Sequence, residues 1–134
     1  MKVALLTGHH PRHFYLASQI EKVTQDLLVV SCALGLNPSE AGHHGDPENE
    51  AISWFNERSK VEKLYFTEIG FTVQKGKVLP VTSSEINSEE VYHTILKFNP
   101  DIIVVYGTPI LKGPVINITP KIINLHLGIS PYYN

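Results

Sequence analysis

Four short apolar runs constrain the fold of this chain more than any other feature of the sequence. They cover Lys2–Thr7, Leu27–Ala33, Asp101–Tyr106 and Lys121–His126. Runs of this length that are apolar throughout are typical of strands buried on both faces, as in a parallel sheet. The sequence therefore predicts four parallel strands.

Helical patterns separate these strands. Residues His13–Thr24 carry apolar side chains at helical spacing. A second helix is predicted to begin after Ser88, which can cap it, and to end at Asn99 before Pro100. Its apolar stripe consists of Val91, Ile95 and Leu96. Because strands alternate with helices, we expect an α/β fold with a parallel sheet and flanking helices.

The middle of the chain gives weaker patterns. Gly35–Glu50 is polar and rich in turn formers, which predicts a loop. Ala51–Lys63 could be a helix with Val61 facing inward, and Val78–Val81 a short strand that Pro80 places at a sheet edge or a strand end. Since no linker or repeat interrupts the chain, residues 1–134 are expected to belong to a single domain.

Composition excludes several classes of protein. The 134 residues carry a net charge of -2 without a basic cluster, so this segment is not expected to bind nucleic acid. The single cysteine, Cys32, rules out an internal disulfide framework and lies in an apolar run, where a buried structural thiol is expected. No apolar segment has the ~20 residues of a membrane span, so we expect a soluble, cytoplasmic protein. The oligomeric state cannot be predicted.

Polar segments follow three of the predicted strands at their carboxyl ends. These segments are Thr7–His13, Tyr106–Leu111 and Asn124–Asn134. Because ligands of parallel sheets gather beyond the carboxyl ends of the strands, these segments are expected to converge on one site.

The last of these segments, residues 124–134, has the sequence NLHLGISPYYN. It resembles the Asn-x-His-x-Ser-x-Leu-Pro-x-Tyr-Arg-Gly signature of the folate-dependent formyltransferases, which include glycinamide ribonucleotide and methionyl-tRNA formyltransferases. The residues that match are Asn124, His126, Pro131 and Tyr133. Gly128, Ser130 and Asn134 stand where the signature has Ser, Leu and Arg. The resemblance implies a Rossmann-like sheet and formyl transfer from 10-formyltetrahydrofolate to an amine.

By this resemblance, Asn124 and His126 are the catalytic candidates. When an amine attacks a formyl group, negative charge develops on the formyl oxygen, and an imidazole or an amide N–H can stabilise it. Without the motif, a turn-forming Asn and a buried structural His would be the simpler interpretation. The segment Tyr106-Gly107-Thr108-Pro109-Ile110-Leu111 resembles the part of the family that wraps the pterin of the donor; an ordinary strand–turn–helix link is the alternative.

The loop Gly8–His13 resembles the region where the family meets the phosphate or sugar of its acceptor, which makes His10, Arg12 and His13 candidates for acceptor binding. The acceptor is expected to be a small molecule with an amine. The histidines also suggest zinc, but no carboxylate or cysteine occurs between Met1 and Glu21, so a metal site is not expected. A plain loop is the third interpretation. For the loop residues His43, His44 and Asp46, a metal site is likewise less expected than a plain loop.

The family's third catalytic residue is an Asp well beyond the His, and no such residue follows His126 here. Asp101 stands at the wrong end of its strand to replace it. We therefore expect the chain to be the amino-terminal part of a longer enzyme and to be inactive alone. The alternative is a non-catalytic α/β binding or interaction module derived from the same fold.

Overall fold

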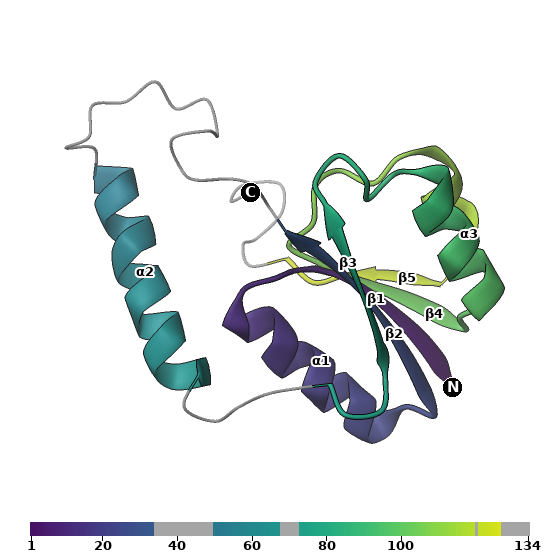
Figure 1. Ribbon diagram of the computed structural model, residues 1–134, viewed down its shortest axis with the longest axis horizontal. Helices are drawn as coiled ribbons and strands as arrows, with labels where there is room; N and C mark the ends of the chain where they lie inside the picture. The colour runs from purple at the N-terminus through teal and green to yellow at the C-terminus, as the bar shows by residue number, and fades with distance from the viewer. Residues whose placement is uncertain (34–49, 68–72, 120, 127–134) are drawn as a thin grey trace.

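The computed structural model describes residues 1–33, 50–67, 73–119 and 121–126 (Figure 1). Their elements, in chain order, are β1 (Lys2–Gly8), α1 (Pro11–Val23), β2 (Asp26–Ala33), α2 (Glu50–Thr67), β3 (Lys77–Thr82), α3 (Glu89–Phe98), β4 (Ile102–Tyr106), the 3-10 helix η1 (Gly113–Asn117) and β5 (Ile122–Asn124). The predicted loop Gly35–Glu50 lies outside the described residues except for Glu50, which begins α2.

The strands form one five-stranded sheet in the order β3-β2-β1-β4-β5, and all neighbouring strands are parallel. This confirms the predicted α/β class with a Rossmann-like arrangement. The segment around Pro80 forms β3 at an edge of the sheet, as predicted. Asp101 lies at the amino end of the sheet, where its Oδ2 accepts a hydrogen bond from the Lys2 backbone N–H at 2.7 Å.

Each face of the sheet has its own apolar core, because side chains alternate along the strands. Ala4 and Leu6 of β1 pack on the face covered by α3 and η1, together with Ile95 of α3. Val3 and Leu5 pack on the opposite face, which α1 covers. In Figure 1, α1 and α3 lie on opposite sides of the sheet, and α2 lies beyond α1. The result is a three-layer arrangement with an additional outer helix.

The capping of α3 follows its sequence. Ser88 Oγ accepts a hydrogen bond from the Val91 N–H at 3.3 Å, and Asn99 ends the helix in the left-handed region with a φ of 53°. Val91 and Ile95 are buried as predicted, whereas Leu96 is 44% exposed. The inclusion of Leu96 in the buried stripe was therefore wrong.

Helix α1 begins two residues earlier than the sequence predicted, at Pro11. Proline fits the first position of a helix because its missing N–H would have no partner there and its φ is already helical. His10 is consequently the N-cap residue, and its N–H donates to His13 Nδ1 at 3.2 Å. The early start places Arg12, as well as His13, on the helix.

Helix α2 packs against α1 through a face that carries charged side chains. Several apolar side chains of α2 are exposed instead. Arg58, Glu62 and Phe66, spaced by four residues, face α1. Val61 is 49% exposed, so the expectation that it faces inward was wrong. The surface of α1 that α2 meets explains the difference: it includes Arg12, which pairs with Glu62, so a charged residue rather than Val61 faces α1 there.

One carboxylate fixes the turn that leads into β3. Glu21 on α1 accepts hydrogen bonds from the backbone N–H groups of Gln74, Lys75 and Gly76 at 2.9, 2.6 and 2.6 Å. These bonds, that from Gln74 first, hold the pKa of the Glu21 carboxyl below its usual value. The charged form of Glu21 therefore stabilises the edge of the sheet.

We expect Glu21→Gln to lower the free energy of unfolding by about 1 kcal/mol, because an amide accepts these bonds more weakly and the site is exposed to solvent. Urea denaturation at pH 7 measures the change. Glu57→Gln is the matched control, since Glu57 forms an exposed ion pair with Lys60 and should change the stability by less than about 0.5 kcal/mol. Equal effects of the two substitutions would contradict the role of Glu21.

Candidate active site

The centre of the sheet is a topological switch point. From β1 the chain continues to β2 and β3 on one side, whereas β4 and β5 lie on the other. A crevice forms beyond the carboxyl ends of two such central strands, because their connections leave in opposite directions. Here the turn after β1 begins at Gly8 and the turn after β4 at Gly107. The strand ends are joined by the Thr7 hydroxyl, which donates a hydrogen bond to the Tyr106 carbonyl at 2.9 Å.

The His13 ring packs between these two turns. A Cβ on Gly8 would collide with His13 Cε1 and lie 2.6 Å from Nδ1, and a Cβ on Gly107 would lie 3.0 Å from Nε2. The ring also meets Tyr106 edge-on, with 4.8 Å between the ring centroids. Because His13 is only 1% exposed, it can act on a ligand only through the backbone that it supports.

Burial keeps His13 uncharged. The pKa of His13 is lowered to about 3, first by burial and then by the positive charge of Arg12. Since Nδ1 accepts from the His10 N–H, the proton of the neutral ring is on Nε2, which is buried and has no hydrogen-bond partner among the described residues. Burial and Arg12 also lower the pKa of His10, whose ring stacks on His9 at 5.1 Å.

A cleft of about 550 Å³ opens next to this turn region. It is formed by α1, α2, the end of β4 and the segment after β5. The residues that line it are Arg12, Tyr15, Leu16, Arg58, Glu62, Phe66, Tyr106, Leu125 and His126. The cleft therefore brings together one residue from each of the three segments that the sequence analysis expected to converge: Arg12, Tyr106 and His126.

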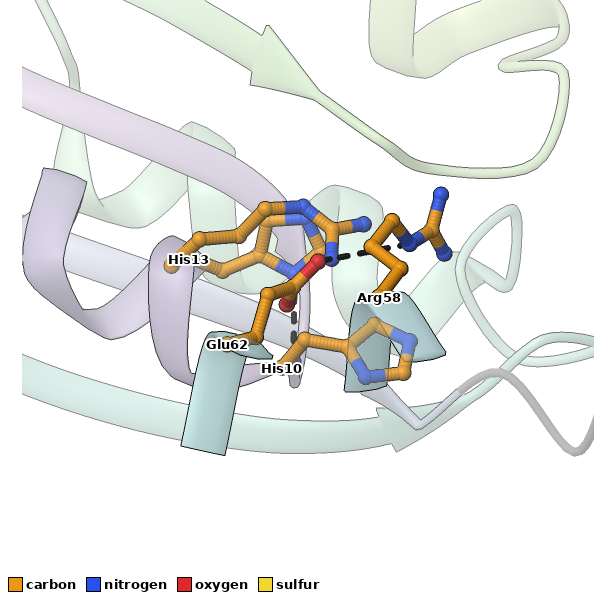
Figure 2. Close-up of polar contacts among 5 residues, drawn as sticks. His10, His13, Arg58 and Glu62 are labelled. Carbon is orange, nitrogen blue, oxygen red and sulfur yellow. Dashed lines mark hydrogen bonds and ion pairs between the residues drawn. The ribbon is translucent and has the colours of Figure 1, made fainter. Parts of the chain in front are cut away.

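A charged cluster forms one wall of this cleft. Glu62 Oε1 accepts a short hydrogen bond from Arg12 Nη1 and forms an ion pair with Arg58 Nε at 3.3 Å. Figure 2 shows Glu62 and Arg58 reaching from α2 towards the side of α1 that carries His13. Sequence reasoning did not single out Arg58 or Glu62. Their spacing of four residues was the available signal, but charges on a helix usually indicate a solvated face.

The two catalytic candidates lie in different places. Strand β5 ends at Asn124, which pairs with Val105, a residue of the core on the α3 side. Asn124 therefore belongs to the α3 face, and it is not among the residues that line the cleft. His126 lies beyond the strand end and lines the cleft. Because β5 ends before His126, the alternation of side chains along a strand does not place His126 on the same face as Asn124. Their catalytic roles stay predictions.

The two ends of the segment predicted to bind the donor, Tyr106–Leu111, also lie in different places. Tyr106 lines the cleft, and Gly107 adopts a φ of 65° that turns the chain away from β4. Further along, the Ile110 carbonyl accepts from Asn87 Nδ2 at 3.0 Å, and Leu111 packs on the α3-side core. The side chain of Ile110 is 81% exposed. The segment therefore runs from the cleft to the α3 side of the sheet, with Thr108 and Pro109 between the two.

Within the described ranges, no group of three or more His, Cys, Asp or Glu side chains could hold a metal ion. None of the helices in these ranges is long and apolar enough to cross a membrane. The interpretations of His43, His44 and Asp46 fall outside the described residues, as does the part of the signature from Gly128 to Asn134.

Comparison with known proteins gives one informative relationship. The chain matches no protein-family profile. It is 33% identical over 95 residues to a methionyl-tRNA formyltransferase of Finegoldia magna, which covers 67% of this chain and 31% of that protein. The chain thus spans about a third of the length of the curated relative that it matches. This similarity supports a formyltransferase-like family for the chain.

The contact between Gly8 and His13 can be tested by a double-mutant cycle. We expect Gly8→Ala to lower the free energy of unfolding by about 1–3 kcal/mol, because the buried ring has no room to move away. In a His13→Asn background the same substitution should have a smaller effect, since Asn lacks the ring atoms but can still accept from the His10 N–H. An equal loss in both backgrounds, measured in urea, would contradict the contact.

The lowered pKa of His13 predicts a pH dependence of stability. The pKa of His13 is 6.5 in the unfolded chain and about 3 in the native protein. At a pH between these two values, the native ring is neutral while the unfolded ring is protonated. The unfolded state then binds more protons than the native state. The contribution of His13 to the free energy of unfolding is therefore fully present above pH 6.5 and falls by up to about 1.4 kcal/mol per pH unit below it. His10 contributes with the same sign.

Proton NMR provides the direct measurement: the His13 ring should not titrate between pH 8 and 4.5, a range that lies above the titration of Glu21. In urea denaturation over the same pH range, the free energy of unfolding should fall less on acidification in His13→Asn than in the wild-type protein. A His13 titration midpoint near pH 6.5 would contradict its buried neutral state.

Proposed function

We propose that this chain forms the amino-terminal part of the active centre of an enzyme that transfers a formyl group from 10-formyltetrahydrofolate to an amine. The observation that carries the proposal is the position of His126: the histidine of the formyltransferase-like motif lines a cleft at the switch point of a parallel sheet. The similarity to a methionyl-tRNA formyltransferase supports the same reaction class.

The proposed chemistry is an acyl transfer. The acceptor nitrogen attacks the formyl carbon, and negative charge develops on the formyl oxygen. His126 donates a hydrogen bond or proton to that oxygen and so stabilises the developing charge. The bond between the formyl carbon and N10 of the donor then breaks, and the proton lost by the amine replaces the formyl group on N10. The products are a formamide and tetrahydrofolate.

The roles of the other candidates follow from their positions. The donor is proposed to lie along Tyr106–Leu111, with its formyl end at Tyr106, beside the cleft. The acceptor enters next to Arg12 and the α1 N-terminus. Asn124 can contribute its amide only if its side chain, or the chain after β5, differs in the bound state, because its strand register directs it towards the α3 face.

Cytoplasmic location is part of this proposal, since a folate-dependent transferase with a single buried cysteine suits a reducing compartment. The acceptor is proposed to be a small molecule, because the chain carries a net charge of -2 without a basic cluster suited to a nucleic acid.

In the natural full-length polypeptide, we expect His126→Ala to lower the turnover of formyl transfer by about 10²–10³-fold, the usual effect of losing one donor to a developing oxyanion. Tetrahydrofolate release with a panel of amines measures turnover, and calorimetry with 5-formyltetrahydrofolate measures donor binding, which should change little. His93→Ala is the control, because His93 is exposed on α3, on the opposite side of the sheet.

Near-normal turnover of His126→Ala would contradict a catalytic role for this residue. If the wild-type protein binds 5-formyltetrahydrofolate but forms no formamide with any amine, the chain is a binding module rather than an enzyme.

A further inference from the structure

The side chain of Asn87 joins two parts of the chain that lie far apart in sequence. Asn87 belongs to the turn between β3 and α3. Its Nδ2 donates to the Ile110 carbonyl at 3.0 Å, and its Oδ1 accepts from the Lys112 N–H at 2.7 Å. A residue of a parallel strand bonds in the same way to the two residues that flank its partner. The amide of Asn87 therefore takes the place of a strand residue beside Leu111.

Asn87 is itself held on both sides. Ile86, the residue before it, is 0% exposed and belongs to the core on the α3 side of the sheet. Ser88, the residue after it, caps α3 by accepting from the Val91 N–H. A side chain between a buried anchor and a helix cap has little freedom to move. Its amide is consequently a fixed reference point for the backbone that it binds.

The segment Tyr106–Leu111 is thus anchored at both of its ends. At the first end, the Thr7 hydroxyl donates to the Tyr106 carbonyl, and the His13 ring lies close to Gly107. At the second end, Asn87 binds the backbone on either side of Leu111.

The second anchor fixes backbone that the core does not need. The Ile110 side chain is 81% exposed, so the hydrogen bond to its carbonyl does not serve the packing of that side chain. Fixed backbone at the surface is what a binding segment requires, because a segment that is already ordered loses less conformational entropy when a ligand binds.

We propose that Asn87 is a positioning residue for the formyl donor: by binding the backbone of Ile110 and Lys112, it holds the segment Tyr106–Leu111 in the conformation that the donor binds. Asn87 lies outside the formyltransferase-like motif and acts only through the backbone. The inference rests on the proposed function, which places the donor along this segment.

Asn87→Ala, in the natural full-length polypeptide, removes both hydrogen bonds. Calorimetry with 5-formyltetrahydrofolate should show donor binding weakened by about five-fold or more, because apparent affinity falls with the fraction of molecules in the binding conformation. Turnover with saturating donor and amine should change much less, since the variant leaves His126 intact. This split is the opposite of that expected for His126→Ala. Amide hydrogen exchange at Lys112 should be faster than in the wild-type protein.

Two further variants complete the test. Asn87→Asp should also weaken donor binding, because a carboxylate can accept from the Lys112 N–H but repels the Ile110 carbonyl. Asn117→Ala is the matched control: Asn117 is an exposed residue of the same type at the end of η1, and donor binding should not change. Circular dichroism checks that each variant is folded.

Unchanged donor affinity in the folded Asn87 variants would overturn the inference, even if exchange at Lys112 is faster, because the hydrogen bonds would then be purely structural. An equal loss of affinity in Asn117→Ala would overturn it as well. Both outcomes leave the proposed function standing. If the wild-type protein does not bind 5-formyltetrahydrofolate, the proposed function itself fails, and this inference fails with it.

Discussion

The packing of one neutral histidine between two glycine turns is the contact on which the candidate site depends. His13 fills the space that side chains at Gly8 and Gly107 would occupy, and it contacts Tyr106 at the end of β4. Because the ring is buried, protonation would place an uncompensated charge in the interior, next to Arg12. The ring therefore acts as a rigid spacer that sets the distance between the two central strand ends, and the adjacent cleft takes its shape from that spacing.

Helix α2 has an orientation that stability alone does not explain. It directs Arg58 and Glu62 towards α1 and leaves Val61, Leu64 and Tyr65 substantially exposed. A buried ion pair contributes little to stability once desolvation is counted, and an apolar contact of the same size would often serve better. The arrangement is easier to understand as a device for presenting charge, since it places two guanidiniums and one carboxylate along a cleft that also contains His126.

The position of His126 also limits how the proposed formyl transfer can proceed. The imidazole and the guanidiniums of Arg12 and Arg58 line one cleft, so an acceptor bound there would present its amine to the same space as the histidine. Glu62 is a poor candidate for the proton acceptor of the reaction, because its Oε1 already accepts a hydrogen bond from Arg12 and forms an ion pair with Arg58. The proton of the amine must therefore pass to another group, in the proposed scheme ultimately to N10 of the donor.

The sequence by itself determined the parallel sheet, the position of its strands, and the ends of α3. These features are local: apolar runs predict buried strands, and Ser88 and Asn99 cap a helix through bonds to their own neighbours. It also indicated that Arg12, Tyr106 and His126 belong to one site, because strand order alone brings carboxyl ends together. Only the tertiary structure decided which side chains face the cleft. The register that pairs Asn124 of β5 with Val105 of β4 leaves Asn124 on the α3 face. The packing of α2 on α1 brings Glu62 to Arg12 across fifty residues of sequence. Such contacts depend on where distant surfaces meet, and no local pattern encodes that.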